Sequence, residues 1–552
     1  MDRRATLAKL FGKKEKRNEV QISSPVISGL APYAGIWDFE KAAHLLRRTI
    51  YGPSYIQIKA VLAAGVESTV DQLLAPEPLP DPPLNFNYTN DPNVPIGATW
   101  INAPFSATDN FIEYRGQSLA GWTLELMANQ GISIREKMVL FWHNHFVTAN
   151  NEDIRYVYRY SNLLRTYATG NFKTLTKEIT IDPAMLRYLN GNQNIKAAPN
   201  ENYARELLEL FTVGKGPLAG PGDYTTFTEQ DVIAMAKVLT GWRDVGYLDN
   251  TGSVPVQSIF VAPQHDTSDK QLSARFNNAI ISNNDGEEYQ DLIDVIFDNE
   301  AVAKHICRKL YRWFVFYEIS AEIEATIINP MAICLEENDF EIKPVLSLLL
   351  KSAHFYDVLN IGCMIKNPID FTLSAFKQFE IAQPTDLEER YTLWVQIFGV
   401  TNLQQMQYYT PPSVAGWKAY YQEPGYAHIW INSVTLPYRL LVTNVLSFIG
   451  FEVGNTRIII DVFDFLSKID DPTNPNAVVI EFAKILFPQP LAINQIVFLK
   501  SILIPGLPDF EWTVEYGAYL ADPDNEMLAN PVKIKLQALV RTMLSMPEFH
   551  LS

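Results

Sequence analysis

The chain has 552 residues, 47% of them hydrophobic and 19% charged, which describes a folded protein with one or more large cores. Its formal net charge of -17 argues against a nucleic-acid-binding body, because neutralising phosphates needs a basic face. No stretch of the sequence approaches the roughly 20 apolar residues of a membrane-spanning helix. The three scattered cysteines are too few for a disulfide framework.

The start of the chain carries the opposite charge to the rest. Arg3 and Arg4 open a segment similar to a twin-arginine export signal, but a charged run at 12–17 stands where such a signal needs about 7–15 apolar residues. We expect residues 1–30 to form a disordered basic arm, either a vestigial or an atypical signal. The protein is periplasmic or in the cell envelope if this signal is functional, and cytoplasmic otherwise.

Helical periodicity dominates the sequence from residue 39. The prolines of 75–95 exclude helix and central strand there. Asn200 and Gly214 supply a start and a stop for one helix, and Thr228 with Asp231 form a capping-box pattern for the next. In chain order, the expected helices cover 39–50, 111–129, 138–148, 154–167, 200–214, 228–241, 292–297, 301–314, 321–336, 344–352, 368–379, 436–448 and 531–546.

β-Character is expected only in the middle of the chain. The segments 254–261 and 272–281 are short, contain β-branched residues and are flanked by turn formers. The predicted fold is therefore mainly α, a large multi-helix globular protein with a small β-hairpin insert. After the arm we expect an N-terminal helical part (31–250), the insert (251–285) and a C-terminal helical part (286–552) packed on the first.

The run Trp142-His143-Asn144-His145-Phe146 is the most informative motif, because buried imidazoles need partners for their ring nitrogens. On a helix, positions i and i+2 lie about 200° apart, so both rings cannot face one ligand. On an extended segment they share a face, as in H-x-H metal motifs. Two readings stay open: a buried helix end whose histidines have separate partners, or a shared metal or acid/base pair.

The predicted helix after Asn200 carries two polar rows. Glu201, Arg205 and Glu209 have the i, i+4, i+8 spacing of a solvated salt-bridge ladder. Glu206 lies in the second row, and the functional alternative is that it faces His143 or His145, where a carboxylate orients an imidazole or completes a metal site.

Two other features are weaker candidates. His265 and Asp266 follow Pro263 and are expected in a loop, where site residues are often carried. Gly241-Trp242 and Gly416-Trp417 are interpreted as helix-to-loop turns in which the tryptophan ring folds back. The ring either packs against the protein or forms a platform for a carbohydrate or other ligand.

Several phrases together resemble a known bacterial family, "domain of unknown function 1800". They are His44 to Arg48 before Tyr51-Gly52-Pro53, Phe141 to Phe146, Asn200 to Leu210, Asp231 to Trp242, His265-Asp266, Pro411 to Trp417 and Ser545 to Phe549. The resemblance implies a mostly helical fold, frequent twin-arginine export, and gene neighbours that look like the sulfatase and alkaline-phosphatase superfamily. It brings no established activity, and this chain departs from the family in lacking the apolar part of the signal.

Two functions are compatible with these residues. The first is a metal-assisted or acid/base enzyme of the cell envelope, a hydrolase for example. Its candidate metal ligands, for a divalent ion that activates water, are His143, His145 and Glu206, with Arg205 as an anion clamp and His265 with Asp266 as a loop contribution. The second is a non-catalytic envelope scaffold or a partner of a sulfatase-like protein, in which the same polar residues form a satisfied structural network.

Overall fold

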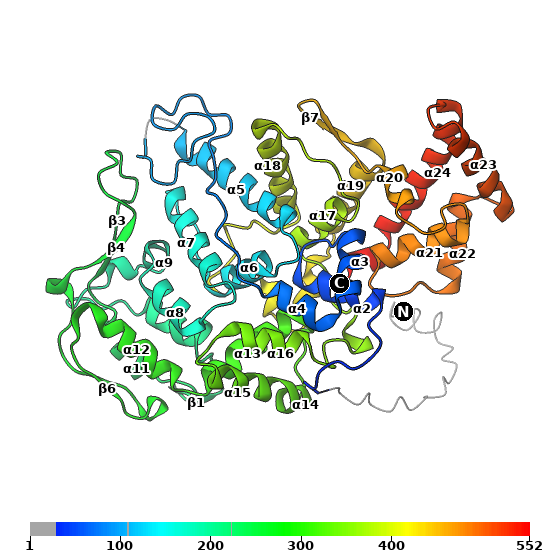
Figure 1. The fold of residues 1–552 in the computed structure, drawn as a ribbon. Helices are drawn as coiled ribbons and strands as arrows, with labels where there is room; N and C mark the ends of the chain where they lie inside the picture. Colours follow the sequence, from blue (N-terminus) through cyan, green and yellow to red (C-terminus); the bar gives the residue numbers. More distant parts are fainter. Residues whose placement is uncertain (1–28, 107–109, 222) are drawn as a thin grey trace, which may run out of the picture.

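The computed structural model describes residues 29–106, 110–221 and 223–552, and within them the molecule is mainly helical (Figure 1). The expected basic arm lies almost wholly outside the described residues. The helices of the first half are α2 (Phe39–Thr49), α3 (Tyr55–Ala64), α4 (Val66–Leu73), α5 (Phe111–Asn129), α6 (Arg135–His145), α7 (Ile154–Thr166), α8 (Phe172–Thr180), α9 (Pro183–Tyr188), α10 (Asn202–Glu206) and α11 (Glu229–Val238).

The second half is also helical. Its helices are α12 (Glu288–Phe297), α13 (Ala301–Phe314), α14 (Ala321–Ile323), α15 (Asn329–Glu337), α16 (Ile342–Leu350), α17 (Pro368–Lys377), α18 (Leu387–Leu403), α19 (Thr435–Asn444), α20 (Val462–Ser467), α21 (Pro475–Leu486), α22 (Ile493–Leu503), α23 (Asp509–Ala521) and α24 (Glu526–Ser545). None of the helices in the described ranges is both long and apolar enough to cross a lipid bilayer.

Local signals explain many of these bounds. Asp38 caps α2 by accepting the Lys41 amide, and the predicted Thr228–Asp231 capping box forms in both directions at the start of α11. The proline-rich stretch before α5 contains no helix among its described residues, as predicted.

The strands form four antiparallel hairpins, β1 (Leu218–Gly220) with β2 (Asp223–Tyr224), β3 (Trp242–Val245) with β4 (Gln257–Phe260), β5 (Lys270–Gln271) with β6 (Ile280–Ile281), and β7 (Phe451–Val453) with β8 (Thr456–Ile458). The expectation that β-structure is confined to the middle is therefore wrong. In the last hairpin Val453 pairs with Thr456 around the two-residue loop Gly454-Asn455. Gly454 has φ +57, the positive value that such a tight turn needs at its first loop position.

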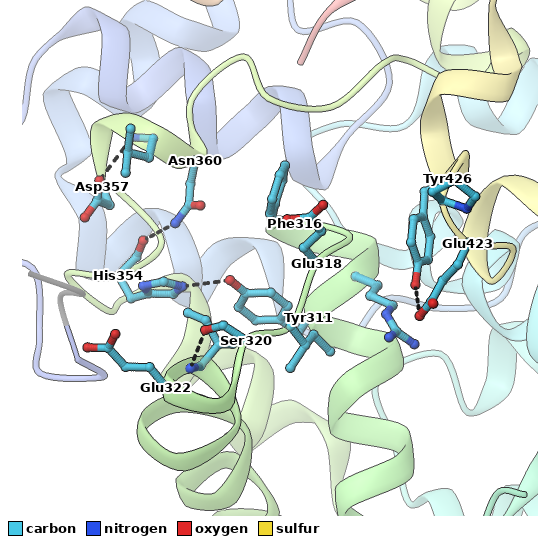
Figure 2. Close-up of a pocket in the computed structure, with 15 residues that line it drawn as sticks. Tyr311, Phe316, Glu318, Ser320, Glu322, His354, Asp357, Asn360, Glu423 and Tyr426 are labelled. Carbon is cyan, nitrogen blue, oxygen red and sulfur yellow. Dashed lines mark hydrogen bonds between the residues drawn. The ribbon is translucent and has the colours of Figure 1, made fainter. Parts of the chain in front are cut away.

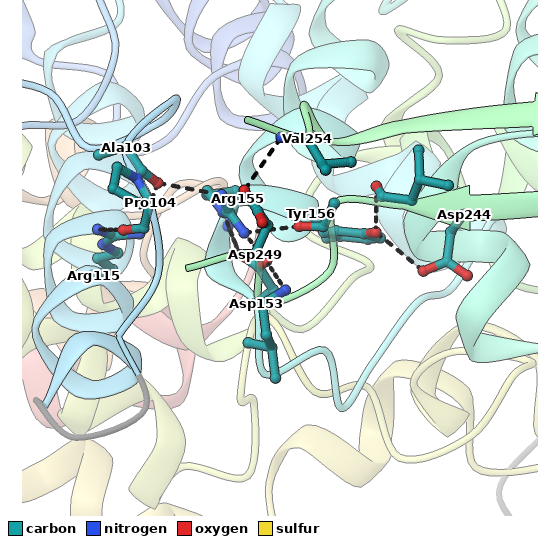
Figure 3. Close-up of polar contacts among 12 residues, drawn as sticks. Ala103, Pro104, Arg115, Asp153, Arg155, Tyr156, Asp244, Asp249 and Val254 are labelled. Atoms are coloured by element: carbon teal, nitrogen blue, oxygen red, sulfur yellow. Dashed lines mark hydrogen bonds and ion pairs between the residues drawn. The ribbon is translucent and has the colours of Figure 1, made fainter. Parts of the chain in front are cut away.

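The β3–β4 hairpin is fixed to the helical body by buried polar contacts (Figure 3). Arg155 on α7 pairs with Asp153 and donates to the Ala103 and Gly246 carbonyls at 3.2 and 2.9 Å. The Tyr156 hydroxyl donates to the Val245 carbonyl at 2.9 Å. These contacts hold the hairpin at one end of the molecule (Figure 1).

Helix α6 lies between the two largest apolar cores. One core is built from residues between Ala42 and Tyr356, and the other mainly from residues between Ile369 and Phe549. Phe141 and Trp142 belong to the first core and Leu140 to the second. This position explains why most of α6 is buried, including the polar side chains of Glu136, Lys137, His143 and His145. The predicted boundary between two helical parts at residue 286 stays a prediction.

Candidate functional site

His143 faces the core between residues 369 and 549. Its side chain is buried, its ring stacks on Tyr408, and its Nε2 lies 2.6 Å from the Tyr408 carbonyl oxygen. Burial lowers the pKa of His143 to about 4, so the ring is neutral at pH 7 and Nε2–H donates to that carbonyl. His143 is thereby held by the backbone.

His145 points the other way, as the helical spacing requires. Its Nε2 lies 3.1 Å from the Phe211 carbonyl, and its Nδ1 lies 2.9 Å from Nζ of Lys309 on α13. Burial, with Lys309 nearby, lowers the pKa of His145 well below its usual range. The neutral ring donates from Nε2 to Phe211 and accepts from Lys309 at Nδ1.

The segment after Asn200 ends in the backbone carbonyls that bind the side chains around His145. Asn200 accepts the Asn202 amide at 2.9 Å, but α10 passes into a π-helical turn at Leu207–Phe211. Carbonyls at the end of a helix have no intrahelical partner. The Leu210 carbonyl accepts from Lys309 Nζ at 2.9 Å and lies 3.0 Å from His305 Nε2. Helical turns of this rare type occur often at functional sites.

Lys309 lines a cavity of about 190 Å³ between α6, α13 and the loop after residue 414. Burial, with the nearby charge of Arg312, lowers the pKa of Lys309 from its ordinary value to about 7. Burial also lowers the pKa of His305, in the same cavity, to about 3. The cavity therefore holds two neutral imidazoles and an amine that changes charge near neutral pH.

Two arginines give the cavity a positive wall. Arg308 pairs with Glu324, with Nε 2.9 Å from Oε2. Arg312 donates from Nε to the Tyr317 carbonyl at 3.1 Å, and no Asp or Glu of the described residues lies within ion-pair distance of it. Arg312 also lines a neighbouring cavity of about 810 Å³. The carboxylates of Glu318, Glu322, Asp357 and Glu423 lie along that neighbour (Figure 2).

Asn144, between the two histidines, joins α6 to the loop on the far wall of the Lys309 cavity. Its Oδ1 accepts the Trp417 amide at 2.9 Å. Gly416 has φ +86, and a Cβ there would lie 2.7 Å from the Asn144 carbonyl oxygen. Only glycine fits this close approach.

The predicted metal ligands are not assembled. Glu206 is partly buried on α10 and makes no hydrogen bond or ion pair to His143 or His145 within the described ranges. Its pKa is raised by burial and then by Glu209. Among the described residues no group of three or more His, Cys, Asp or Glu is placed to hold a metal ion. The structure does not bring His143, His145 and Glu206 together, since the two rings diverge on one helix.

Arg205 belongs to the salt-bridge ladder and not to the cavity. It pairs with Glu201 at 3.1 Å and with Glu229 at 2.7 Å. The predicted anion clamp is thus already occupied by two carboxylates on the surface.

His265 and Asp266 lie in a separate buried network. His265 Nε2 is 2.8 Å from Glu288 Oε2, its Nδ1 is 2.9 Å from the Thr240 carbonyl, and Lys270 pairs with the same Glu288. Burial alone would raise the pKa of Asp266, but hydrogen bonds from Ser268 lower it overall. These groups pair with one another, and nothing in the described ranges joins them to His145.

A comparison with protein-family models adds a decisive observation. The model described as "Protein of unknown function (DUF1800)" matches residues 44–551, nearly the whole chain. The chain belongs to the DUF1800 family. No curated protein and no solved structure matches it.

Three of the phrases that resemble DUF1800 meet at the Lys309 cavity. Phe141, Asn144 and His145 belong to the phrase Phe141 to Phe146. Leu210 belongs to the phrase Asn200 to Leu210, and Ala415 to the phrase Pro411 to Trp417. They line one cavity although they stand far apart in the chain. This cavity is therefore lined in part by three of the segments that carry the resemblance.

Sequence reasoning predicted the helix that completes the cavity in this DUF1800 chain but not its contribution to the site. His305, Arg308, Lys309 and Arg312 stand at i, i+3, i+4 and i+7 of the helix predicted at 301–314. This spacing places four basic side chains on one face, and that row was the available signal.

Proposed function

We propose that this DUF1800 chain is an acid/base enzyme in which Lys309 accepts a proton and Arg312 beside it holds an anionic substrate group. The observation that carries the proposal is the Lys309 amine, whose pKa lies near 7 in a cavity lined by His145, Arg308 and Arg312. A general base is most effective when its pKa is close to the working pH.

The contacts of Lys309 support this role. A neutral amine has two N–H bonds, and two acceptors lie 2.9 Å from Nζ, namely His145 Nδ1 and the Leu210 carbonyl. The remaining tetrahedral position then carries the lone pair, which can take a proton. Strongly perturbed pKa values in a cavity are typical of functional sites.

The size and charge of the cavity suggest the substrate class. About 190 Å³ is less than the roughly 300–1,000 Å³ of ordinary ligand pockets, which favours a small substrate or the end of a longer one. Arg312, without a carboxylate partner among the described residues, is suited to a carboxylate or phosphate group. The adjoining cavity of about 810 Å³ gives room for the remainder of a longer substrate.

Reductive trapping with glyoxylate, a small anionic aldehyde, tests the reactivity of Lys309. The neutral amine attacks the aldehyde, water leaves, and cyanoborohydride supplies hydride to the imine, which fixes a carboxymethyl group that mass spectrometry maps. We expect the rate at Lys309 to be half-maximal near pH 7, with Lys304 on the same helix as the internal reference. Labelling of Lys309 no faster than Lys304 at pH 7 would favour the alternative, a non-catalytic scaffold or partner of a sulfatase-like protein.

Turnover provides the second measurement. A panel of small carboxylate-bearing esters and amides is incubated with the wild type, Lys309→Met and Lys304→Met. Hydrolysis that is kept in Lys304→Met and lost in Lys309→Met supports a hydrolase. Hydrolysis that survives in Lys309→Met contradicts the role given to this amine.

A further inference from the structure

A second, smaller cavity lies where α2, α6 and the start of α17 meet. It measures about 30 Å³, and its charged lining side chains are Arg47, Arg48, Lys137, Lys366 and Asp370. We call it the cationic cavity. Its four basic residues are each no more than 4% exposed. Four positive side chains and one negative side chain leave three positive side chains without a partner side chain in its wall, which also contains the last residue, Ser552.

The hydrogen bonds of the cationic cavity do not neutralise it. Asp370 pairs with Lys137. Lys366 Nζ donates to the Phe549 carbonyl at 2.8 Å, and Arg47 donates to the Lys484 and Ile485 carbonyls at 3.1 and 3.0 Å. These carbonyl acceptors carry no net charge.

The two arginines of α2 also have unused donors. Arg48 donates from Nη2 to the Asn360 carbonyl at 2.8 Å and to Cys363 Sγ at 3.2 Å. The Nε atoms of Arg47 and Arg48 are buried and have no hydrogen-bond partner within the described residues. A buried donor without an acceptor costs about 1–3 kcal/mol, and more in a charged group.

Arg439 on α19 adds a further positive charge behind the cavity wall. It is 0% exposed, donates from Nη2 to the Lys366 carbonyl at 2.8 Å and lies over the Phe371 ring. Its Nε and Nη1 have no partner among the described residues. Burial, with the charge of Arg47 next, lowers the pKa of Lys366 to about 7. The protein therefore concentrates uncompensated positive charge at this junction of helices.

We propose that the cationic cavity binds one monatomic anion of chloride's size. Buried charges are stable only when they are paired, and for four cationic side chains the wall supplies the Asp370 carboxylate and the carboxyl group of the last residue, Ser552. A cavity of about 30 Å³ has room for one small group, which favours a compact anion over a large organic one. The anion accepts from Lys366 and from arginine N–H groups and holds α2, α6 and α17 together.

This site is separate from the proposed active site. The two cavities share the walls Trp313 and Tyr420 but none of their charged side chains. The proposal therefore does not depend on the chemistry of Lys309.

Thermal unfolding in two salts tests the site in solution. The melting temperature is measured at pH 7 in sodium chloride and in sodium gluconate at equal ionic strength, because gluconate is too large for the cavity. We expect a saturable rise of at least about 2 °C that is specific to chloride. The rise is lost in Lys366→Met and kept in Lys309→Met, which removes a lysine from the other cavity. Equal responses to the two salts overturn the proposal.

Crystals of the wild type in bromide locate the anion without any variant. An anomalous peak between Lys366 and Arg48 supports the site. Because this experiment uses the wild type, it holds even where Lys366→Met does not fold. Bromide peaks only at other positions overturn it.

Discussion

Asn144, between the two histidines of the motif, links α6 to the turn at Gly416. Because a Cβ on Gly416 would lie 2.7 Å from the Asn144 carbonyl oxygen, Gly416→Ala should separate α6 from this turn. Overpacking of this kind costs about 1–3 kcal/mol, in addition to roughly 1–2 kcal/mol for a side chain at positive φ. We expect the free energy of unfolding in urea to fall by the sum of these two costs. We also expect slower glyoxylate labelling of Lys309.

Gly97 is a matched control for that substitution. It has φ +84, close to the +86 of Gly416, but a Cβ there meets nothing within 4 Å. Gly97→Ala should therefore show the backbone cost alone. Equal losses of stability in the two variants would show that the approach of Asn144 to Gly416 does not matter.

At the scale of single elements, α13 sets the electrostatics of the proposed site. Arg312 lowers the pKa of Lys309 across one turn of this helix. Arg312→Met should therefore move the pH midpoint of glyoxylate labelling at Lys309 upward, towards the ordinary value for lysine. Arg312→Lys keeps the charge and should keep the midpoint near pH 7. An unchanged midpoint in Arg312→Met would mean that burial alone sets the pKa.

The π-helical turn at Leu207–Phe211 contributes carbonyls and not side-chain chemistry. Its composition is that of an ordinary amphipathic helix, so the sequence predicted a helix at 200–214 without this irregularity. The predicted partner, Glu206, is a side chain, whereas His145 is bound by the Phe211 carbonyl. Backbone acceptors leave no mark in a sequence, and this is why the Phe211 carbonyl was not among the partners considered for His145.

At the scale of the whole molecule, elements with local signals were predictable and contacts between distant segments were not. The helices Phe111–Asn129 and Ala301–Phe314 have the predicted bounds, because apolar stripes and end signals lie within them. Helix Leu387–Leu403 was missed, since its aromatic and aliphatic residues show no clear stripe. The contact between His145 and Lys309 joins residues 164 positions apart, which periodicity cannot reveal.

The buried lysines give the whole molecule a distinctive pH dependence. Burial lowers the pKa of Lys309 and Lys366 to about 7, and that of Lys377 to about 8. Between pH 7 and 8.5 the unfolded chain therefore binds more protons than the folded one, so the free energy of unfolding rises with pH. With up to about 1.4 kcal/mol per lysine and pH unit, we expect a rise of about 4 kcal/mol in urea unfolding in sodium gluconate.

Variants and salt show how much each lysine contributes to the pH dependence of the free energy of unfolding. Lys309→Met and Lys366→Met should each make the slope smaller, because each removes one lysine whose proton affinity differs between the two states. A flat profile in the wild type would contradict the lowered pKa values. Chloride should also reduce the slope, since an anion in the cationic cavity favours the protonated form of Lys366 and raises its pKa. Because Lys309 lies in the other cavity, Lys309→Met should keep this difference between chloride and gluconate, and Lys366→Met should remove it.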